Sequence, residues 1–277
     1  MAASTTSTLD DLFANIIAQA RFTAEEQSLM AGLVTRYDIG GQAGKTVQVP
    51  KYPAITAAAL TEGTDMSSTT VSTSSVTITV AEVGAQVVLT DMAAMGAGDP
   101  ANELGTVLGN SIATKIDTDL LALFDGFSTA LGSAGTEITV ADIFKAAATL
   151  RTNKAQGDMF AVLHPYQAYV VKAGLTNTFA NPNGGVKQNE AMVNGYVGTL
   201  AGIDVYESSL ISIDGSDDAK AGVFSREALA LAMKRDFQIE RQRDASLRGW
   251  ELNATAIYGV GELEDTYGIE MLFDAAL

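Results

Sequence analysis

The interpretation of this chain turns on the stretch GYVGTLAGIDVYES, residues 195–208. Its glycines, Gly195, Gly198 and Gly202, have at first sight the look of a phosphate-binding loop. A dinucleotide-binding fingerprint needs a strand before its glycines and a helix after them, whereas here the strand-like run IDVYES follows the glycines. The Gly-Lys-Ser/Thr of a nucleoside-triphosphate loop is also missing. We therefore interpret the three glycines as a structural turn before a core strand.

The composition argues against several classes of function. The chain has 277 residues, of which 47% are hydrophobic, enough for a sizeable core. Its 33 acidic residues against 17 basic ones give a net charge of −16 at pH 7, so most of its surface repels nucleic acid and anionic membranes. This net charge argues against a protein that binds specific DNA sequences. It does not argue against a protein that encloses DNA without binding it tightly. The chain has no cysteine, which excludes disulfides and thiolate metal sites.

Membrane insertion and secretion are not expected. No apolar run reaches the ~18 residues that a membrane span needs. The first residues, MAASTTSTLDDLF, lack the basic region and the apolar core of a secretory signal. We expect a protein that is made and used in a cytoplasm.

The first ninety residues change from helical to strand periodicity. Residues 8–34 carry apolar side chains at helical spacing and predict two short helices. From residue 45 to residue 90 apolar residues alternate instead, in KTVQVP, SVTITV and VGAQVVL, which predicts three strands. The third of these is one register off the second, and Gly84 near the slip predicts a β-bulge.

Between these strands lies TEGTDMSSTTVSTSS, residues 61–75, which has almost no side chains to bury. Two interpretations stay open. One is a disordered linker. The other is a long two-stranded hairpin arm, which is marginal in water by itself and needs a neighbouring subunit to lie on. The second interpretation predicts an oligomer.

The middle of the chain predicts a long helix and then a mixed segment. Asp99 and Pro100 suit the start of a helix, and apolar residues then recur every three or four positions. The pattern predicts a helix over 100–126, which would be ~40 Å long. Further predicted elements are a helix over 139–152, a buried strand over 159–163, a helix from Pro165 to Val171 and a loop over 177–189.

The C-terminal part predicts two strands. Apolar and polar residues alternate over 250–258 and again over 267–273. Trp250 heads the first of these runs, and we expect it to be buried as an anchor of the core sheet.

The sequence offers little for catalysis. His164, the only histidine, follows an apolar strand and precedes a proline, which favours a capping or packing role over acid–base catalysis. The acidic turn DGSDD fits a solvated turn better than a calcium site, because it lacks EF-hand spacing. Its carboxylates are Asp214, Asp217 and Asp218. No G-x-S-x-G nucleophile motif occurs. We expect no enzymatic activity, no metal and no cofactor.

A basic stripe lies in the strand-rich end of the chain. Its members are Arg235, Arg241, Arg243 and Arg248. On an acidic protein such a stripe suits acidic groups of a neighbouring copy, and this complementarity sets specificity and register more than affinity. Glu62 and Asp65 are the partners that this interpretation predicts. The alternative is a solvated strand face, paired locally with Asp236, Glu240 and Asp244.

Several stretches, taken in order, resemble the major capsid proteins of tailed phages (Caudoviricetes). GTLAGIDVYESSLI matches that family's pattern G-x-L-x-G-x-x-V-x-x-S at Gly198, Leu200, Gly202, Val205 and Ser208. The arm with Glu62 and Gly63 is similar to the family's extended loop, and the predicted long helix is similar to its spine helix. VLHPYQAYVV is similar to its strand–turn–helix, and WELNATAIYGVGELEDTYGIEMLF to its two closing strands separated by glycine.

The resemblance implies an α+β protein with the Hong Kong phage-type (Johnson) major capsid fold. That fold has an N-terminal arm, an extended β-hairpin loop, a peripheral domain with the spine helix, and an axial domain. In this chain the expected ranges are 1–42 for the arm, 43–90 for the extended loop, 91–158 for the peripheral domain, 159–235 for the axial domain and 236–277 for the closing strands of the peripheral domain.

The resemblance also implies a structural function. Such proteins self-assemble as hexamers and pentamers into an icosahedral phage head that encloses double-stranded DNA. The implied partners are further copies of the chain, a portal, and scaffold or decoration proteins; the implied location is the virion, after assembly in the host cytoplasm. The extended loop would lie across the adjacent subunit, with contacts expected at Glu62, Gly63, Asp65 and Val71.

Two departures from the family pattern matter. In some members a lysine on the extended loop forms a covalent cross-link to another subunit of the shell. Here residues 54–114 contain no lysine, and Lys45 and Lys51 lie only at the base of the arm. We therefore expect no covalent cross-links. No long coiled-coil segment precedes the arm, so we expect either a separate scaffold, or sufficient N-terminal helices, or no scaffold.

Two rival functions stay open. An encapsulin-type bacterial compartment, which encloses cargo enzymes, would have a similar fold, and its sequence pattern separates poorly from that of a phage capsid. A metal-dependent or carboxylate hydrolase would instead be a monomer or small oligomer with a concave acidic site.

Overall fold

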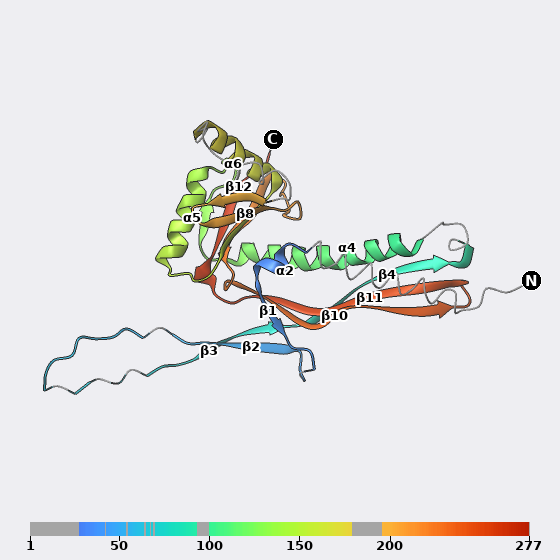
Figure 1. The fold of residues 1–277 in the computed structure, drawn as a ribbon, viewed down its shortest axis with the longest axis horizontal. Coiled ribbons are helices and arrows are strands. Elements are labelled where there is room, and N and C mark those ends of the chain that lie inside the picture. Colours follow the sequence, from blue (N-terminus) through green and yellow to red (C-terminus); the bar gives the residue numbers. More distant parts are fainter. Residues whose placement is uncertain are drawn as a thin grey trace, which may run out of the picture.

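Two β-sheets and one long helix organise the chain. The computed structural model describes residues 28–276 apart from 42, 54, 64, 67, 69, 93–99 and 179–195. Most of the first predicted helices, 8–34, and most of the predicted loop, 177–189, lie outside the described residues. The predicted α+β class is confirmed, with the sheets forming a lobe and an elongated platform (Figure 1).

The six-stranded sheet forms the lobe at the upper left of Figure 1. Its strands, in spatial order, are β5 (Ala130–Gly132), β12 (Gly268–Asp274), β9 (Asp218–Ser225), β6 (Met159–Leu163), β8 (Ile203–Glu207) and β7 (Tyr196–Leu200). Helices α5 (Val140–Thr152) and α6 (Pro165–Thr178) pack in the same lobe. The central strands β6 and β9 are buried along almost their whole length. For β6 this agrees with its uninterrupted apolar run.

The predicted helix over 139–152 and strand over 159–163 are confirmed as α5 and β6. Thr139 opens α5 in a capping box, in which the Asp142 carboxylate accepts hydrogen bonds from the Thr139 N–H (3.0 Å) and hydroxyl (2.7 Å). The helix that begins at Pro165 extends to Thr178, beyond the start of the predicted loop.

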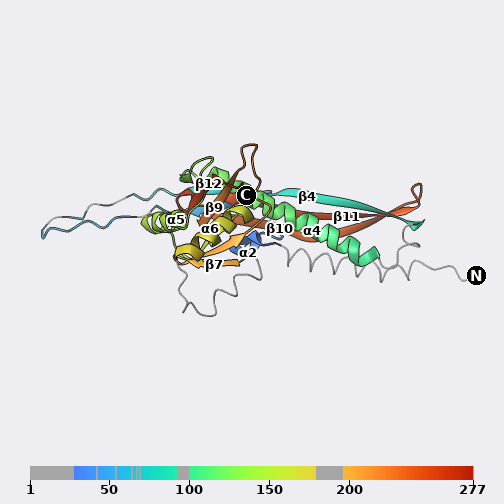
Figure 2. The ribbon, with the colours of Figure 1, turned by 90° about the horizontal axis from the view of Figure 1, so that it is seen from above.

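The four-stranded sheet forms the platform. Its strands, in spatial order, are β1 (Thr35–Asp38), β10 (Leu229–Asp244), β11 (Gly249–Glu262) and β4 (Ala81–Thr90). Helix α4 (Pro100–Leu121) lies along one face of this sheet and continues into the 3₁₀ helix η1 (Ala122–Gly126) (Figure 2). The predicted long helix over 100–126 is therefore confirmed, with its last five residues wound more tightly.

A separate two-stranded stem connects the platform to an extended loop. Strands β2 (Thr46–Lys51) and β3 (Ser74–Thr79) pair antiparallel over all six residues. After Val80 alone the chain leaves β3 and enters β4, which pairs with β11 instead. This change of sheet explains why the apolar pattern slips by one residue.

The predicted β-bulge at Gly84 is wrong. Strand β4 pairs with β11 without any register shift from Ala81 to Thr90. Gly84 serves a close approach of the two strands, because a Cβ there would lie 3.0 Å from the Ala254 carbonyl oxygen.

The two closing strands alternate as predicted but do not pair with each other. Strand β11 belongs to the platform, whereas β12 follows the short 3₁₀ helix η2 (Asp265–Tyr267) and joins the six-stranded sheet. The predicted domain ranges stay predictions, and sheet membership cuts across at least three of them. Strand β4, inside the range predicted as the extended loop, belongs to the platform. Strand β10 begins at Leu229, inside the range predicted as axial, and β12 lies beside β9.

The expectation that Trp250 is fully buried is wrong. The residues that alternate after it, from Leu252 to Tyr258, are buried, whereas Trp250 itself is half-buried near the far end of the platform. The guanidinium groups of Arg241 and Arg243 lie 5.9 Å and 5.3 Å from its ring centroid. The ring therefore packs partly against the main hydrophobic core and carries these two cations over it.

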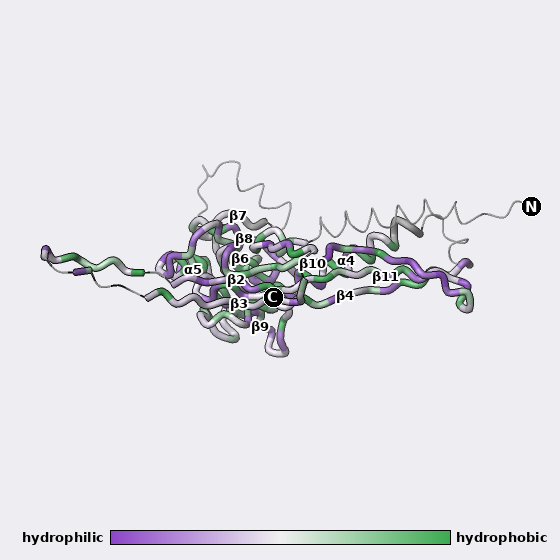
Figure 3. The backbone as a smooth tube through the Cα atoms, turned by 90° about the horizontal axis from the view of Figure 1, so that it is seen from below, coloured by the Kyte–Doolittle hydropathy of each residue, from purple (hydrophilic) through white to green (hydrophobic). Residues whose placement is uncertain are grey.

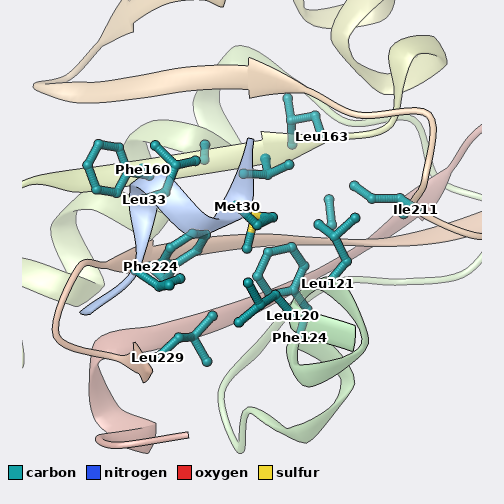
Figure 4. Packing of buried hydrophobic residues seen from close by; sticks show 14 of the residues in the cluster. Met30, Leu33, Leu120, Leu121, Phe124, Phe160, Leu163, Ile211, Phe224 and Leu229 are labelled. Atoms are coloured by element: carbon teal, nitrogen blue, oxygen red, sulfur yellow. The ribbon is translucent and has the colours of Figure 1, made fainter. Parts of the chain in front are cut away.

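The end of the long helix joins the two sheets in one hydrophobic core (Figure 4). Phe124 is fully buried, with its ring centroid 5.4 Å from that of Phe224 on β9 and 6.2 Å from that of Phe127. Gly222 makes room for this ring, because a Cβ at that position would lie 2.6 Å from it. The helix direction is therefore tied to the six-stranded sheet at this point.

Asp117 on α4 anchors the start of the described chain. Its carboxylate accepts hydrogen bonds from the Ser28 hydroxyl (2.8 Å) and from the N–H groups of Leu29 (2.9 Å) and Met30 (3.2 Å). It caps the short helix α2 (Met30–Leu33), which has no side-chain cap of its own. Burial raises the pKa of Asp117, and the three hydrogen bonds act in the opposite direction.

We expect Asp117→Ala to lower the free energy of unfolding by about 3 kcal/mol, because buried or half-buried donors lose their acceptor. Lys115→Ala is the matched control on the same helix, since Lys115 makes an exposed ion pair with Asp119 (2.5 Å) worth ~0.5 kcal/mol. Urea titration of the dissociated subunit measures both variants. Equal losses in the two variants would contradict the anchoring role of Asp117.

Candidate subunit interface

The extended loop, residues 52–73, projects from the stem and away from both sheets (Figure 1). Its described residues lie in no strand, so the predicted two-stranded arm is correct for the stem and wrong for the loop beyond it. Glu62 and Gly63 form a turn, in which Gly63 takes a φ of 80° that other residues avoid. Glu62 and Asp65 are the only charged residues of this loop, and both are exposed.

Large apolar side chains of the loop face solvent. Five of them are 41–73% exposed: Tyr52, Ile55, Leu60, Met66 and Val71. Figure 3 shows these hydrophobic stretches of the loop outside the body of the subunit. Several large exposed apolar side chains on one projecting segment favour a site of interaction with another macromolecule.

The stem of the loop is held firmly. Val47, Val49 and Val76 of the stem pack against a small second core, in which Ile78 and Val80 meet Ala230 and Ala232 of β10. The ammonium group of Lys51 lies 3.0 Å from a carboxylate oxygen of Glu264, which follows β11. The direction in which the loop leaves the platform is therefore set by packing and by an ion pair.

The basic stripe runs along β10 to the turn that follows it. Arg235 reaches across β11 to Glu82 on β4, with 2.8 Å between the charged atoms. Arg243 makes two parallel hydrogen bonds, 2.7 Å and 2.8 Å, to the carboxylate of Asp91, and its guanidinium lowers the pKa of that carboxyl. Both hydrogen-bonded partners lie on or just beyond β4. Of the local partners that the alternative named, Asp236, Glu240 and Asp244, the last also attracts Arg243.

The other two arginines of the stripe sit near the far end of the platform. Arg241 lies over the Trp250 ring, and Arg248 occupies the turn between β10 and β11 with a φ of 51°. The loop residues lie at the opposite end of the molecule (Figure 1). The subunit does not bring its own loop and its own stripe together, so a meeting between them requires two copies.

The glycines of the opening stretch serve backbone geometry. Ala201 and Gly202, with φ of 55° and 81°, form the two-residue turn between β7 and β8. Gly198 has a φ of 126° at a register shift within β7. Gly195 lies outside the described residues. The structural interpretation is confirmed for Gly202, whereas Gly198 shapes a strand rather than the turn.

His164 caps a helix and packs, as predicted. It is 8% exposed, its Nδ1 accepts a hydrogen bond from the Tyr166 N–H (3.3 Å), and its ring meets the Tyr166 ring edge-on. Burial lowers the pKa of His164, which keeps the ring neutral as this acceptor role needs. The neighbouring Gln167 is fully buried and donates to the carbonyl oxygens of Ala219 and Phe273 (both 3.0 Å).

The acidic turn DGSDD, which leads into β9, is held by hydrogen bonds from its own backbone N–H groups to a carboxylate of the turn. Asp214 accepts hydrogen bonds from the N–H groups of Ser216 (2.8 Å) and Asp218 (3.0 Å). Among the described residues, no three histidine or carboxylate side chains gather as metal ligands would. Nor does any described helix have the length and apolarity to cross a membrane.

Comparison with known proteins places the fold. No curated protein is recognisably similar to the chain. The head structure of Helicobacter pylori bacteriophage KHP40 matches with a TM-score of 0.71 and 14% identity, over 88% of each chain. Mycobacterium phage Che8 matches with a TM-score of 0.69 and 19% identity, over 88% of this chain and 90% of that one. A virus-like particle from Pyrococcus furiosus matches with a TM-score of 0.65 and 9% identity, over 94% and 98%.

At these identities the structural matches establish the fold alone. The sequence itself supplies the family: the family model described as "Phage capsid protein" matches residues 73–270. That range begins in the stem and includes the spine helix, the platform strands other than β1, and most of the six-stranded sheet. The chain therefore belongs to the phage capsid protein family, with the Hong Kong phage-type fold.

Proposed function

We propose that this chain is the major capsid protein of a phage head, and that its copies assemble as hexamers and pentamers into an icosahedral shell around double-stranded DNA. The observation that carries the proposal is the extended loop. It exposes large apolar side chains at one end of an elongated subunit, out of reach of its own platform. A contact between the loop of one copy and the platform of the next is head-to-tail, and such contacts generate rings when the rotation closes.

Charge supports the same arrangement. Glu62 and Asp65 make the loop acidic, whereas the stripe with Arg241 and Arg248 is basic on a chain whose net charge is −16. In the proposed contact, Glu62, Gly63, Asp65 and Val71 lie against a neighbouring copy whose stripe faces the two carboxylates. Within one subunit, Arg235 pairs with Glu82 and Arg243 pairs with Asp91. Arg241 and Arg248 lie at the end of the platform that is farthest from the subunit's own loop.

The acidic composition suits enclosing DNA without binding it. Phosphate groups meet net repulsion, so packed DNA moves freely against the shell. In this proposal the six-stranded lobe is the axial domain and the platform with α4 the peripheral domain. The further partners are a portal and any scaffold or decoration protein, the location is the virion, and assembly takes place in the host cytoplasm.

An encapsulin-type compartment is the alternative within the same fold. The match to the virus-like particle from Pyrococcus furiosus means that fold likeness alone does not separate one protein shell from another. The family model favours the phage head. The structure does not support the hydrolase hypothesis. His164 caps a helix, and the Asp214 carboxylate accepts hydrogen bonds from backbone N–H groups of its own turn.

Electron microscopy and sedimentation of the purified protein test the proposal directly. We expect closed shells or capsomer rings, and double-stranded DNA inside native particles. Enzyme cargo in place of DNA would select the encapsulin alternative. A monodisperse monomer in every buffer would overturn shell formation.

We expect the shell to be free of covalent cross-links. The loop lacks a lysine, and Lys51 at its base is paired with Glu264. Denaturing gels of boiled particles should therefore show one band at the subunit mass. A ladder of covalent multimers would contradict this expectation.

Charge reversal tests the contact between loop and stripe. The double variant Glu62→Lys/Asp65→Lys should raise the protein concentration needed for assembly by about tenfold at low salt, and less at high salt. Adding Arg241→Glu and Arg248→Glu should restore assembly. The loop is then basic and this part of the stripe acidic, so the two surfaces attract each other again. Thr61→Lys serves as a matched control for added charge beside the tip. If the reversed loop assembles like the wild type at low salt, the loop does not face the stripe.

A further inference from the structure

The outer edge of the platform is an open strand. Strand β4 is ten residues long and pairs on one side with β11; among the described residues no strand pairs with its other side. It contains no proline and a single charge, Glu82, which is held by Arg235. Natural sheets usually block such edges with charges, prolines or bulges, because an open edge is a template for another strand.

The register of β4 shows which backbone groups face outwards. The Asp91 N–H donates to the Arg248 carbonyl oxygen (2.9 Å), which marks a hydrogen-bonded pair directly beyond the end of β4. Such pairs alternate in an antiparallel ladder, so the odd-numbered residues from 81 to 89 bond to β11. The even-numbered residues from 82 to 88 direct their N–H and C=O groups away from β11, toward the open edge.

A groove lies beside this edge, between β4 and α4. It has a volume of about 620 Å³, and its walls include Val83 and Gly84 on the strand and Val107, Asn110 and Lys115 on the helix. The side-chain carbonyl oxygen of Asn110 is buried and has no hydrogen-bond partner. A buried acceptor without a partner is costly, and an incoming strand brings N–H groups on both of its edges.

One segment of the chain has matching properties. Residues 55–60 of the loop, ITAAAL, are exposed, uncharged and free of glycine and proline, and their small alanines suit a narrow groove. No backbone–backbone hydrogen bond joins this segment to any other described residue. Ile55 and Leu60 are 59% and 66% exposed. The loop of the same subunit points away from the far end of β4 (Figure 2), so the occupant is the loop of another copy.

We propose that residues 55–60 of a second copy add to β4 as a fifth strand of the platform, with backbone hydrogen bonds to the even-numbered residues of β4 and side chains in the groove against α4. The proposal rests on the shell function proposed above and names its contact surface. Backbone pairing supplies affinity in such strand addition, and the side-chain groove supplies specificity.

The first test removes one outward N–H from β4. Gln86→Pro deletes a donor that faces the open edge, and an edge strand tolerates proline at such a position. We expect about a tenfold rise in the concentration needed for assembly, equivalent to ~1.4 kcal/mol per contact. Gln86→Ala, the matched control, alters the same side chain and keeps the N–H, so it should assemble like the wild type. Equal loss in both variants would mean a side-chain contact and would overturn the proposal.

A second test keeps the proposal falsifiable if Gln86→Pro does not fold. Proline is placed in turn at Thr56, Ala57, Ala58 and Ala59, which are exposed and lie outside the core. Because alternate residues of a strand face the same neighbour, strand addition predicts that the four variants alternate between strong and weak loss of assembly. A uniform effect, or no effect, would overturn it.

The readouts separate this inference from the shell function. Electron microscopy of the wild type tests the shell by itself. Shells in the wild type together with unchanged assembly in Gln86→Pro and in all four loop variants would leave the shell function intact and refute strand addition. The absence of any wild-type assembly would refute both.

Discussion

The packing of Phe124 between the two sheets is the constraint on which the rest of the structure depends. The long helix ends in this ring, which lies against Phe224 and fills the space that Gly222 leaves open. Because interiors are packed as densely as organic crystals, the helix and the sheet cannot tilt here without opening a void. The direction of α4, and with it the platform that α4 covers, is set relative to the six-stranded lobe.

The body of the subunit pairs most of its buried polar groups, with the side-chain oxygen of Asn110 as an exception, whereas the loop leaves its apolar side chains exposed. In the body, awkward polar groups have partners: Asp117 caps α2, Gln167 bridges Ala219 and Phe273, and Glu264 pairs with Lys51. In the loop, apolar side chains face water. Folding alone gains little by ordering the loop, since ordering costs about 1–2 kcal/mol of backbone entropy per residue. A loop of this kind is explained by what assembly gains from it.

The local elements of this fold were predictable from the sequence, and the non-local pairings were not. The long helix, the capping box at Thr139 and the alternation after Trp250 follow from spacing within one element. The change of sheet at Val80 leaves one local signal, the slip of the apolar pattern by one residue, but that slip does not show which strands β3 and β4 pair with. For the same reason β11 and β12 looked like neighbours although they lie in different sheets.

The candidate interface was predictable in part. The loop was recognisable from its composition, and the stripe from four arginines close in sequence. Their intrachain partners, Glu82 and Asp91, lie about 150 residues away in sequence and become neighbours only through the order β10–β11–β4. The open edge of β4 could not be predicted for the same reason, because the residues of a strand do not show whether it lies in the middle or at the edge of its sheet.

Subunits that carry both an open strand edge and a loop proposed to pair with it can associate without limit, unless the geometry of the contact prevents it. A head-to-tail contact between identical subunits closes into a ring only if its rotation divides the circle, and otherwise it grows into a filament. That rotation depends on the angle between the loop and the platform. The Lys51–Glu264 pair and the small core of the stem hold this angle on the loop side, and the Phe124 packing holds the lobe on the other. Rings of five and of six then require only a modest change of this angle.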